Sequence, residues 1–340
     1  MAKRVGKQTL FPDRPAIILS HAAIVGKKEG EGPLGKGFDY VSEDGYFGEN
    51  SWEKAEQQML RRAFSLCCDK AGMAPSELDF LLGGDLLNQC TSSSLSMKEC
   101  GVPYWGLYGA CSTMAEGLCL ASLLVDGGSA DTACVLTGSH FCTAERQYRF
   151  PLEYGGTRPR SSQWTVTGAG AVLLGSFGDG IRLTALTPGK IVDAGVKDPN
   201  HMGAAMAPAA CDTLVTHLRD TGRELADYDA VFTGDLGALG HDILRDLLAA
   251  EGVDTDARYS DCGVLIYDLR TQGVNSGGSG CGCCASVLAG HILPAMERGV
   301  WKRVLFAATG ALMSPTSAQQ GESIPGICHA LVLERTGEGA

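Results

Sequence analysis

Residues 78–87 (LDFLLGGDLL) and 228–237 (YDAVFTGDLG) have the same pattern, an apolar, β-prone run that ends in Gly-Asp-Leu. Each run is preceded by a helix pattern, at residues 51–71 and 201–221, with apolar side chains at three- and four-residue spacing. The two triplets are 150 residues apart, and so are the two helix starts. We interpret this agreement as an internal duplication of the chain.

Signals before and after these stretches repeat in the same order. Predicted strands at residues 16–25 and 181–192 open the two halves, and a small-residue turn leads into a helix at Gly109 and again at Gly280. Further strands follow at residues 132–139, 168–177, 303–310 and 326–335. Strands that alternate with helices form parallel-rich sheets covered by helices. The sequence therefore predicts an α/β protein, a five-layered α/β/α/β/α sandwich of two duplicated halves, residues 1–177 and 178–340, with the helices after the two turns between the sheets.

The composition indicates a soluble globular protein. The chain has 340 residues, of which 44% are hydrophobic and 20% charged, so its core excludes a disordered chain and a disulfide-stapled miniprotein. Its formal net charge of −11 argues against nucleic acid as a partner. The sequence contains neither a signal peptide nor an apolar run of the about 20 residues that span a bilayer. Without export, the 14 cysteines indicate free thiols in a reducing compartment.

Cys111 is the strongest candidate for a functional residue. A strand that ends near Tyr108 turns through Gly-Ala-Cys-Ser directly into a helix, and the unpaired N–H groups and dipole of a helix N-terminus favour a thiolate. We expect Cys111 and Ser112 at the floor of a cleft between the two halves. The alternative is a buried structural cysteine, which is the commonest role of a free thiol.

The duplicated halves, the Gly-Ala-Cys-Ser turn and the loop GGSGCG at residues 277–282 resemble the thiolase and ketoacyl synthase superfamily. Within it, residues 146–174, 201–214 and 233–244 are similar to the stage V sporulation protein AD family. The resemblance implies a thiolase-like protein that binds dipicolinic acid (pyridine-2,6-dicarboxylate), alone or as its calcium chelate, without converting it. It also implies a place at the periphery of the forespore or spore inner membrane, with the other stage V sporulation protein A membrane subunits of the dipicolinate transport machinery as partners. A homodimer is the usual state in the superfamily.

Partners of a catalytic cysteine are missing from the second half. A condensing enzyme needs a His and an Asn, or a second His, to polarise the thioester carbonyl and stabilise its enolate. In synthases that resemble this chain the His follows the strand equivalent to residues 228–233, but here Gly234 and Asp235 follow it, and the glycine loop contains neither His nor Asn. His241 and Asn275 lie a few residues away and keep an alternative open, a Cys-dependent acyltransferase or condensing enzyme that uses a CoA or carrier thioester. A third alternative is an interaction subunit with a vestigial pocket.

An Arg-rich insert at residues 141–165 is the candidate anion site. Its basic residues Arg146, Arg149, Arg158 and Arg160 outnumber its acidic residues Glu145 and Glu153 by two. Guanidinium groups pair bidentately with carboxylates, as a dicarboxylate ligand requires, and we expect Arg146 and Arg149 to bind it. The alternative is a loop that forms salt bridges with the acidic surface.

His140 and His201 are the two histidines expected near the cleft, where each would hydrogen-bond a ligand carboxylate. A structural role is the alternative for both. The cysteines at residues 281–284 (CGCC) have C-x-x-C spacing, but a structural zinc site needs a second pair, which Cys262 and Cys328 do not provide. We therefore predict neither a metal nor a cofactor.

Overall fold

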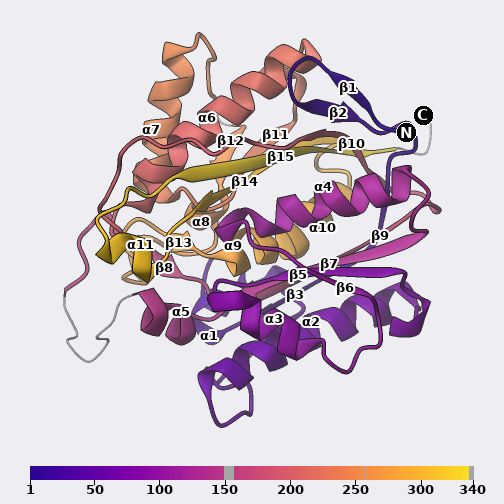
Figure 1. The fold of residues 1–340 in the computed structure, drawn as a ribbon, viewed down its shortest axis with the longest axis horizontal. Helices are drawn as coiled ribbons and strands as arrows, with labels where there is room; N and C mark the ends of the chain where they lie inside the picture. The colour runs from indigo at the N-terminus through magenta and orange to yellow at the C-terminus, as the bar shows by residue number, and fades with distance from the viewer. Residues whose placement is uncertain (149–156, 257, 337–340) are drawn as a thin grey trace.

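The computed structural model describes residues 1–148, 157–256 and 258–336 of the chain (Figure 1). Strands of the first half are β3 (Ile17–Val25), β5 (Phe80–Gly84), β6 (Tyr104–Gly106), β7 (Thr132–Ser139) and β9 (Gly168–Gly175). Strands of the second half are β10 (Ile181–Thr187), β11 (Ala230–Thr233), β12 (Tyr259–Asp261), β14 (Arg303–Ala311) and β15 (Gly326–Arg335). β10 ends before the predicted residue 192, because Pro188 cannot donate a ladder hydrogen bond.

The two halves have the same topology. The strand order is β6–β5–β7–β9–β3 in the first half and β12–β11–β14–β15–β10 in the second. In the first half β5 pairs in parallel with β7, and β9 pairs antiparallel with β3. In the second half β11 pairs in parallel with β14, and β15 pairs antiparallel with β10. A single residue pair, Ile17 with Arg182, joins β3 to β10. The duplication predicted from the Gly-Asp-Leu triplets is confirmed.

Helices form three layers around the two halves of the sheet (Figure 1). The outer layers are α2 (Trp52–Ala71) with α3 (Thr91–Ser96) on the first half, and α6 (Met202–Thr221) with α7 (Gly237–Ala250) on the second. The middle layer contains α4 (Thr113–Asp126), α9 (Cys281–Val287) and α10 (Leu293–Glu297). α4 contacts β7 of the first half and β14 and β15 of the second. This is the predicted five-layered sandwich.

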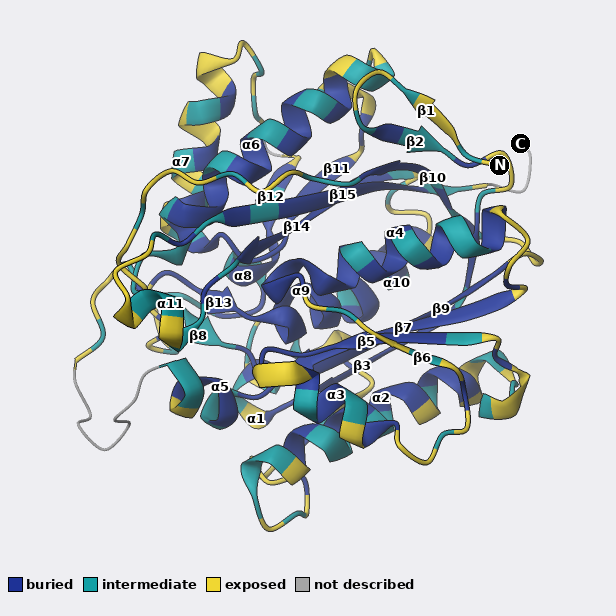
Figure 2. Ribbon diagram, viewed as in Figure 1, coloured by how far each residue is buried: buried dark blue, intermediate teal, exposed yellow. Residues whose placement is uncertain are grey.

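The middle helices are buried because their residues are small or apolar around most of the circumference (Figure 2). Every residue of α9 is buried. A close approach to β9 requires Gly170, where a Cβ atom would come within 2.4 Å of the backbone oxygen of Ala285. The two short helices α8 (Cys262–Leu265) and α11 (Pro315–Gln319) lie in connecting segments.

Two segments lie outside the duplication. Residues 26–50 contain α1 (Lys27–Gly30) and β4 (Tyr40–Val41), and the buried Glu29 carboxylate accepts hydrogen bonds from the Tyr267 hydroxyl and from the N–H of Thr167. The Arg-rich insert begins with helix α5 (Phe141–Tyr148), whose polar and apolar residues separate onto two faces. It ends in β8 (Trp164–Thr165), which pairs with β13 (Gly278–Ser279) of the glycine loop.

The N-terminal hairpin belongs spatially to the second half. It consists of β1 (Lys3–Val5) and β2 (Thr9–Phe11), and Leu10 of β2 pairs with Leu186 of β10. The Asp220 carboxylate, near the end of α6, accepts hydrogen bonds from three backbone N–H groups of the hairpin turn. The first residues of the chain are therefore anchored to an element that lies 211 to 213 residues away in sequence.

Candidate functional site

Cys111 lies at a sharp turn between β6 and α4, as the sequence predicts. Ala110 has a left-handed backbone (φ 50°), and a short 3-10 turn at Ala110–Ser112 leads into the helix. The buried Ser112 hydroxyl donates to the carbonyl of Gly109 at 2.6 Å, and the Thr113 hydroxyl accepts from the Gly109 N–H at 3.0 Å. These contacts fix the turn and use the Ser112 hydroxyl within it, while Cys111 lines a cavity of about 330 Å³.

The cavity is bounded by both halves of the molecule. Its wall includes two tyrosines, whose hydroxyl oxygens are 3.2 Å apart, and several polar side chains. The polar side chains of the lining include Tyr108, Tyr148, Arg158, Gln163, Thr165 and Asn200. Met202, the first residue of α6, also lines it, so the N-terminal end of a 20-residue helix faces the cavity. A small planar ligand fits a cavity of this size.

Asp235 is the side chain that interacts with Cys111. It follows β11 in the second Gly-Asp-Leu triplet and is fully buried. Its carboxylate accepts hydrogen bonds from the hydroxyls of Thr309 and Ser279 and from the Gly280 N–H, each at 2.9 Å. Burial, followed by the Asp235 charge and a hydrogen bond to its carboxylate, raises the pKa of the Cys111 thiol well above its usual range. Burial also raises the pKa of Asp235. Cys111 is therefore a protonated thiol at neutral pH.

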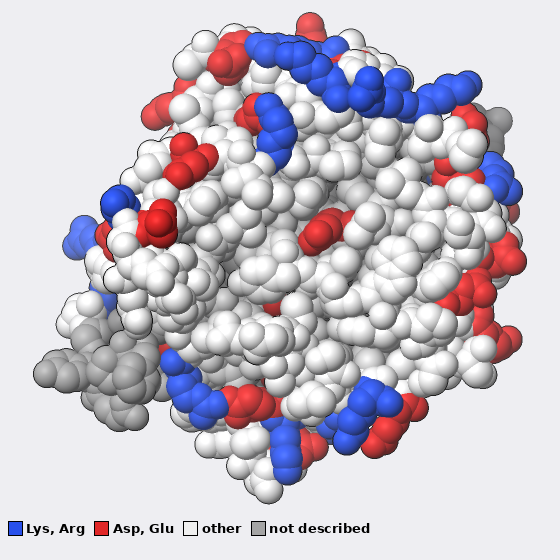
Figure 3. All heavy atoms as spheres, in the orientation of Figure 1, with Lys and Arg blue, Asp and Glu red and all other residues white. Residues whose placement is uncertain are grey.

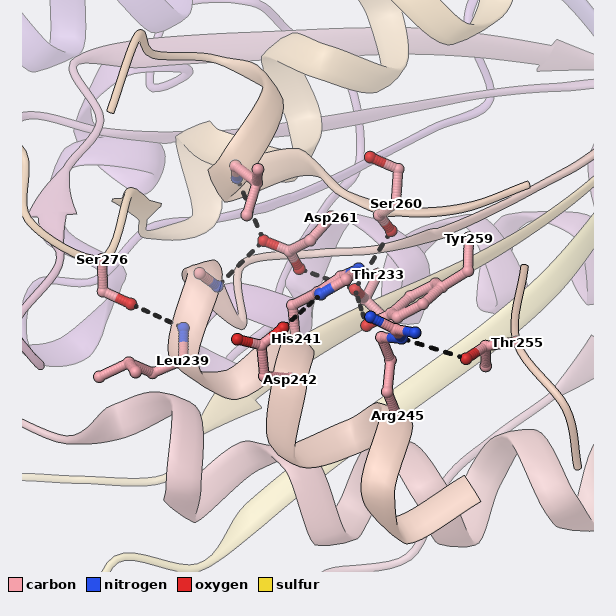
Figure 4. Close-up of polar contacts among 12 residues, drawn as sticks. Thr233, Leu239, His241, Asp242, Arg245, Thr255, Tyr259, Ser260, Asp261 and Ser276 are labelled. Atoms are coloured by element: carbon pink, nitrogen blue, oxygen red, sulfur yellow. Dashed lines mark hydrogen bonds and ion pairs between the residues drawn. The ribbon is translucent and has the colours of Figure 1, made fainter. Parts of the chain in front are cut away.

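His241 and Asn275 do not enter the cavity lining. His241, on α7, stacks on Tyr259 with ring centres 4.4 Å apart, and lies beside Asp242 (Figure 4). The Asn275 side-chain amide donates to the Ser162 hydroxyl at 3.1 Å. Neither residue lines the cavity with Cys111, and the side chain that interacts with its thiol is Asp235.

Asp261 supports the turn that carries Asp235, and sequence patterns missed it. Figure 4 shows its carboxylate beside Thr233 and the start of α7. It accepts from the Thr233 hydroxyl at 2.7 Å and from the N–H groups of Leu236 and Gly237 at 2.9 and 3.0 Å. Burial raises the pKa of Asp261 to about 7. The sequence signal for Asp261 is an N-cap residue at the end of a short strand.

Among the arginines of the insert, Arg158 reaches the cavity. Its guanidinium pairs with the buried Glu145 carboxylate at 2.6 Å and lies over the rings of Phe141 and Trp164, 5.1 and 4.8 Å from their centres. Arg146, which we expected to bind the ligand, is half exposed, pairs with Glu53 on α2 and does not line the cavity. Arg149, expected in the same role, lies outside the described residues.

Both candidate histidines are near the cavity but not in its lining. His140 is buried, its Nε2 is 2.7 Å from the carbonyl oxygen of Gly45, and burial lowers its pKa. His201 is the residue before α6, between Asn200 and Met202, which do line the cavity. The thiols of the Cys-Gly-Cys-Cys cluster are buried; that of Cys284 donates to the carbonyl oxygen of Cys111 at 3.4 Å.

Three comparisons place the chain among known proteins. A profile of the family "Stage V sporulation protein AD (SpoVAD)" matches residues 6–334. The stage V sporulation protein AD of Bacillus subtilis (strain 168) is 43% identical over 335 residues, which cover 98% of this chain and 99% of that protein. No described helix is long and apolar enough to cross a bilayer.

Solved structures share the fold at low identity. The 3-oxoacyl-[acyl-carrier-protein] synthase III of Aquifex aeolicus superposes with a TM-score of 0.57 at 15% identity, over 94% of this chain and 99% of that one. A variant of OleA from Xanthomonas campestris gives a TM-score of 0.59 at 14% identity, over 98% of this chain and 99% of that one. These likenesses show a thiolase-like fold. The match over nearly the full length shows that the chain belongs to the stage V sporulation protein AD family.

Proposed function

We propose that this sporulation protein binds dipicolinic acid without converting it. The observation that carries the proposal is one cavity in which Arg158 and two tyrosines lie near a Cys111 that is held as a thiol. One nitrogen of the Arg158 guanidinium pairs with Glu145 and another donates to the carbonyl of Gln163. The remaining N–H groups of the guanidinium can donate to a ligand carboxylate, and aromatic rings can cover a flat heteroaromatic ring. The N-terminal end of α6 adds a positive dipole at the same cavity.

Lack of turnover follows from the surroundings of Cys111. Acyl transfer requires the thiolate, and both burial and the Asp235 carboxylate favour the protonated thiol. A condensing enzyme activates its cysteine instead with a proton acceptor and stabilises the developing oxyanion. Asp235 is already engaged by three hydrogen-bond donors, and its charge would oppose an enolate.

The proposed setting is the dipicolinate uptake machinery of the forming spore. The chain would act at the periphery of the spore inner membrane, beside the other stage V sporulation protein A membrane subunits, and take its ligand free or as the calcium chelate. A non-spanning subunit of this kind presents the ligand to membrane partners without itself crossing the bilayer.

Calorimetric titration with dipicolinate, with and without calcium, tests the proposal. Arg158→Ala should weaken binding by roughly 10- to 100-fold, because a charge-assisted hydrogen bond in a partly desolvated site contributes about 1.5–3 kcal/mol. Arg158→Lys should also weaken it, because Lys keeps the charge and loses the planar fork. Arg146→Ala is the matched control: it removes an arginine of the same insert that does not line the cavity, and should leave the affinity unchanged.

Incubation with acetyl-CoA separates the alternatives. Mass spectrometry should find Cys111 unmodified and no thioester hydrolysis above a Cys111→Ala control. An acyl adduct on Cys111 with turnover would establish the acyltransferase instead. Absence of both dipicolinate binding and acylation would support the third alternative, an interaction subunit with a vestigial pocket.

A further inference from the structure

Basic side chains gather along one edge of the molecule. Figure 3 shows Lys and Arg in a band over the β1–β2 hairpin and the adjoining end of α6. We call Lys3, Arg4, Lys7, Lys190 and Arg219 the basic edge. It lies at the C-terminal end of α6, whereas the cavity lies at the N-terminal end of this 20-residue helix. The two features are therefore separate.

A set of backbone hydrogen bonds brings these residues together. The Asp220 carboxylate, next to Arg219, accepts from the N–H groups of Lys7 at 2.8 Å and of Gln8 and Thr9 at 2.9 Å. The Gln8 side-chain amide donates to the carbonyl of Pro188 at 3.0 Å, which places the hairpin turn beside the segment that carries Lys190. The Asp220 carboxylate is thus engaged by the backbone of the hairpin turn.

Cations of the basic edge extend further into solvent than the anions that pair with them. The exposed fractions of cation and anion are 80% and 46% for Lys3–Asp13, 60% and 28% for Lys190–Asp212, and 70% and 48% for Arg219–Glu251. Arg4 and Lys7 are exposed and form no ion pair within the described ranges 1–148, 157–256 and 258–336. On this edge each paired cation is thus more exposed than its anion, and two further cations have no ion pair in the described residues, in a chain of net charge −11.

We propose that the basic edge binds the anionic surface of a lipid bilayer. The residues come from a hairpin, a helix end and a connecting segment that lie side by side, so a layer of lipid phosphates can meet several of their side chains at once. Anionic headgroups attract each nearby Lys or Arg and repel the rest of this acidic chain, which fixes the orientation of the protein. The inference rests on the proposed role beside a membrane. It identifies the basic edge as the surface that contacts the membrane, and anionic lipids as the partners of that surface.

Vesicle flotation tests the inference with the full chain. At low salt the protein should float with phosphatidylglycerol vesicles and stay in solution with phosphatidylcholine vesicles, and added salt should release it. Each cation near the surface contributes roughly fivefold to the partition coefficient, so Arg4→Gln/Lys7→Gln should lower binding by about 25-fold. Both side chains are exposed, and a thermal melt checks that the variant folds.

Lys36→Gln/Lys54→Gln is the matched control. It makes the same change in net charge at two exposed lysines of the first half, and should bind as the wild type does. Equal loss in the two double variants would show a net-charge effect and overturn the inference. Failure of the wild type to float with anionic vesicles would also overturn the inference. The basic edge would then be a binding surface for an acidic protein instead. Dipicolinate titration of Arg4→Gln/Lys7→Gln should give the wild-type affinity, so failure at the basic edge and failure at the cavity are distinguishable.

Discussion

Burial and one neighbouring carboxylate decide what the Cys111 thiol can do. The turn and the helix N-terminus favour a thiolate, but burial and the Asp235 carboxylate act in the opposite direction and prevail. From sequence, Cys111 could be singled out, and the missing His was visible. That Asp235 itself contacts the thiol was not, because the two residues are 124 positions apart and meet only when the halves pack.

Asp235→Asn should make Cys111 more reactive. The substitution removes the negative charge that disfavours a thiolate, so the pKa of Cys111 falls, and the thiolate fraction rises about tenfold for each unit of pKa. Alkylation by iodoacetamide at pH 8, followed at the Cys111 peptide by mass spectrometry, measures this. Asp242→Asn, an exposed aspartate on α7, is the control. Equal rates in wild type and Asp235→Asn would show that burial alone sets the pKa.

At the level of elements, Asp261 links the end of β11 to the starts of α7 and α8. Its pKa is raised to about 7 in the folded chain, against about 3.9 in an unfolded one. Between these values the folded state holds a proton that the unfolded state has released. The contribution of Asp261 is therefore complete below about pH 4 and is lost as the pH rises to about 7, at no more than about 1.4 kcal/mol per pH unit.

Denaturant unfolding between pH 4.5 and pH 8 tests this contribution. Asp261→Asn should abolish it, so the difference in unfolding free energy between wild type and variant should shrink as the pH rises. His217 acts in the opposite sense, because burial lowers its pKa to about 4 and its contribution is lost as the pH falls below about 6.5. That contribution cancels in the difference. A difference independent of pH would contradict the raised pKa of Asp261.

Long elements were predictable and short ones were not. The helices α2 and α6 have apolar residues at helical spacing. The strands β7 and β15 are nearly continuous buried runs, which stand out in the sequence as apolar, β-prone segments. Helix α5 was missed because its eight residues are too few for a helical periodicity to stand out in the sequence. Arg146, rather than Arg158, was predicted to bind the ligand. Without the position and direction of α5, the sequence cannot tell which arginine of the insert points toward the cavity.

Over the whole molecule, the two halves interlock at their helix starts. Gly310, at the end of β14 in the second half, lies against the turn that carries Cys111 in the first. In the opposite direction, the Gly282 N–H at the start of α9 donates to the Ser139 hydroxyl at the end of β7 at 3.1 Å. The cavity therefore exists only when both halves are folded together.

Gly310→Ala should damage both stability and ligand binding. The new Cβ atom would lie 2.5 Å from the carbonyl oxygen of Gly109, so the backbone around Cys111 must move, and overpacking of this kind costs about 1–3 kcal/mol. Urea denaturation and dipicolinate calorimetry measure the two effects. Gly45→Ala is the control, because a Cβ atom there meets nothing within 4 Å. Wild-type stability in Gly310→Ala would contradict the interlocked arrangement.

The anchoring of the N-terminal hairpin sets the order in which the chain can be completed during translation. Domains generally fold as they leave the ribosome, from the N-terminus onward. Here Leu10 cannot pair until Leu186 has been synthesised, and the N–H groups of residues 7–9 cannot form their hydrogen bonds until Asp220 has been synthesised. The first residues to be synthesised are thus among the last to reach their final positions, and the basic edge is assembled only after α6 has emerged.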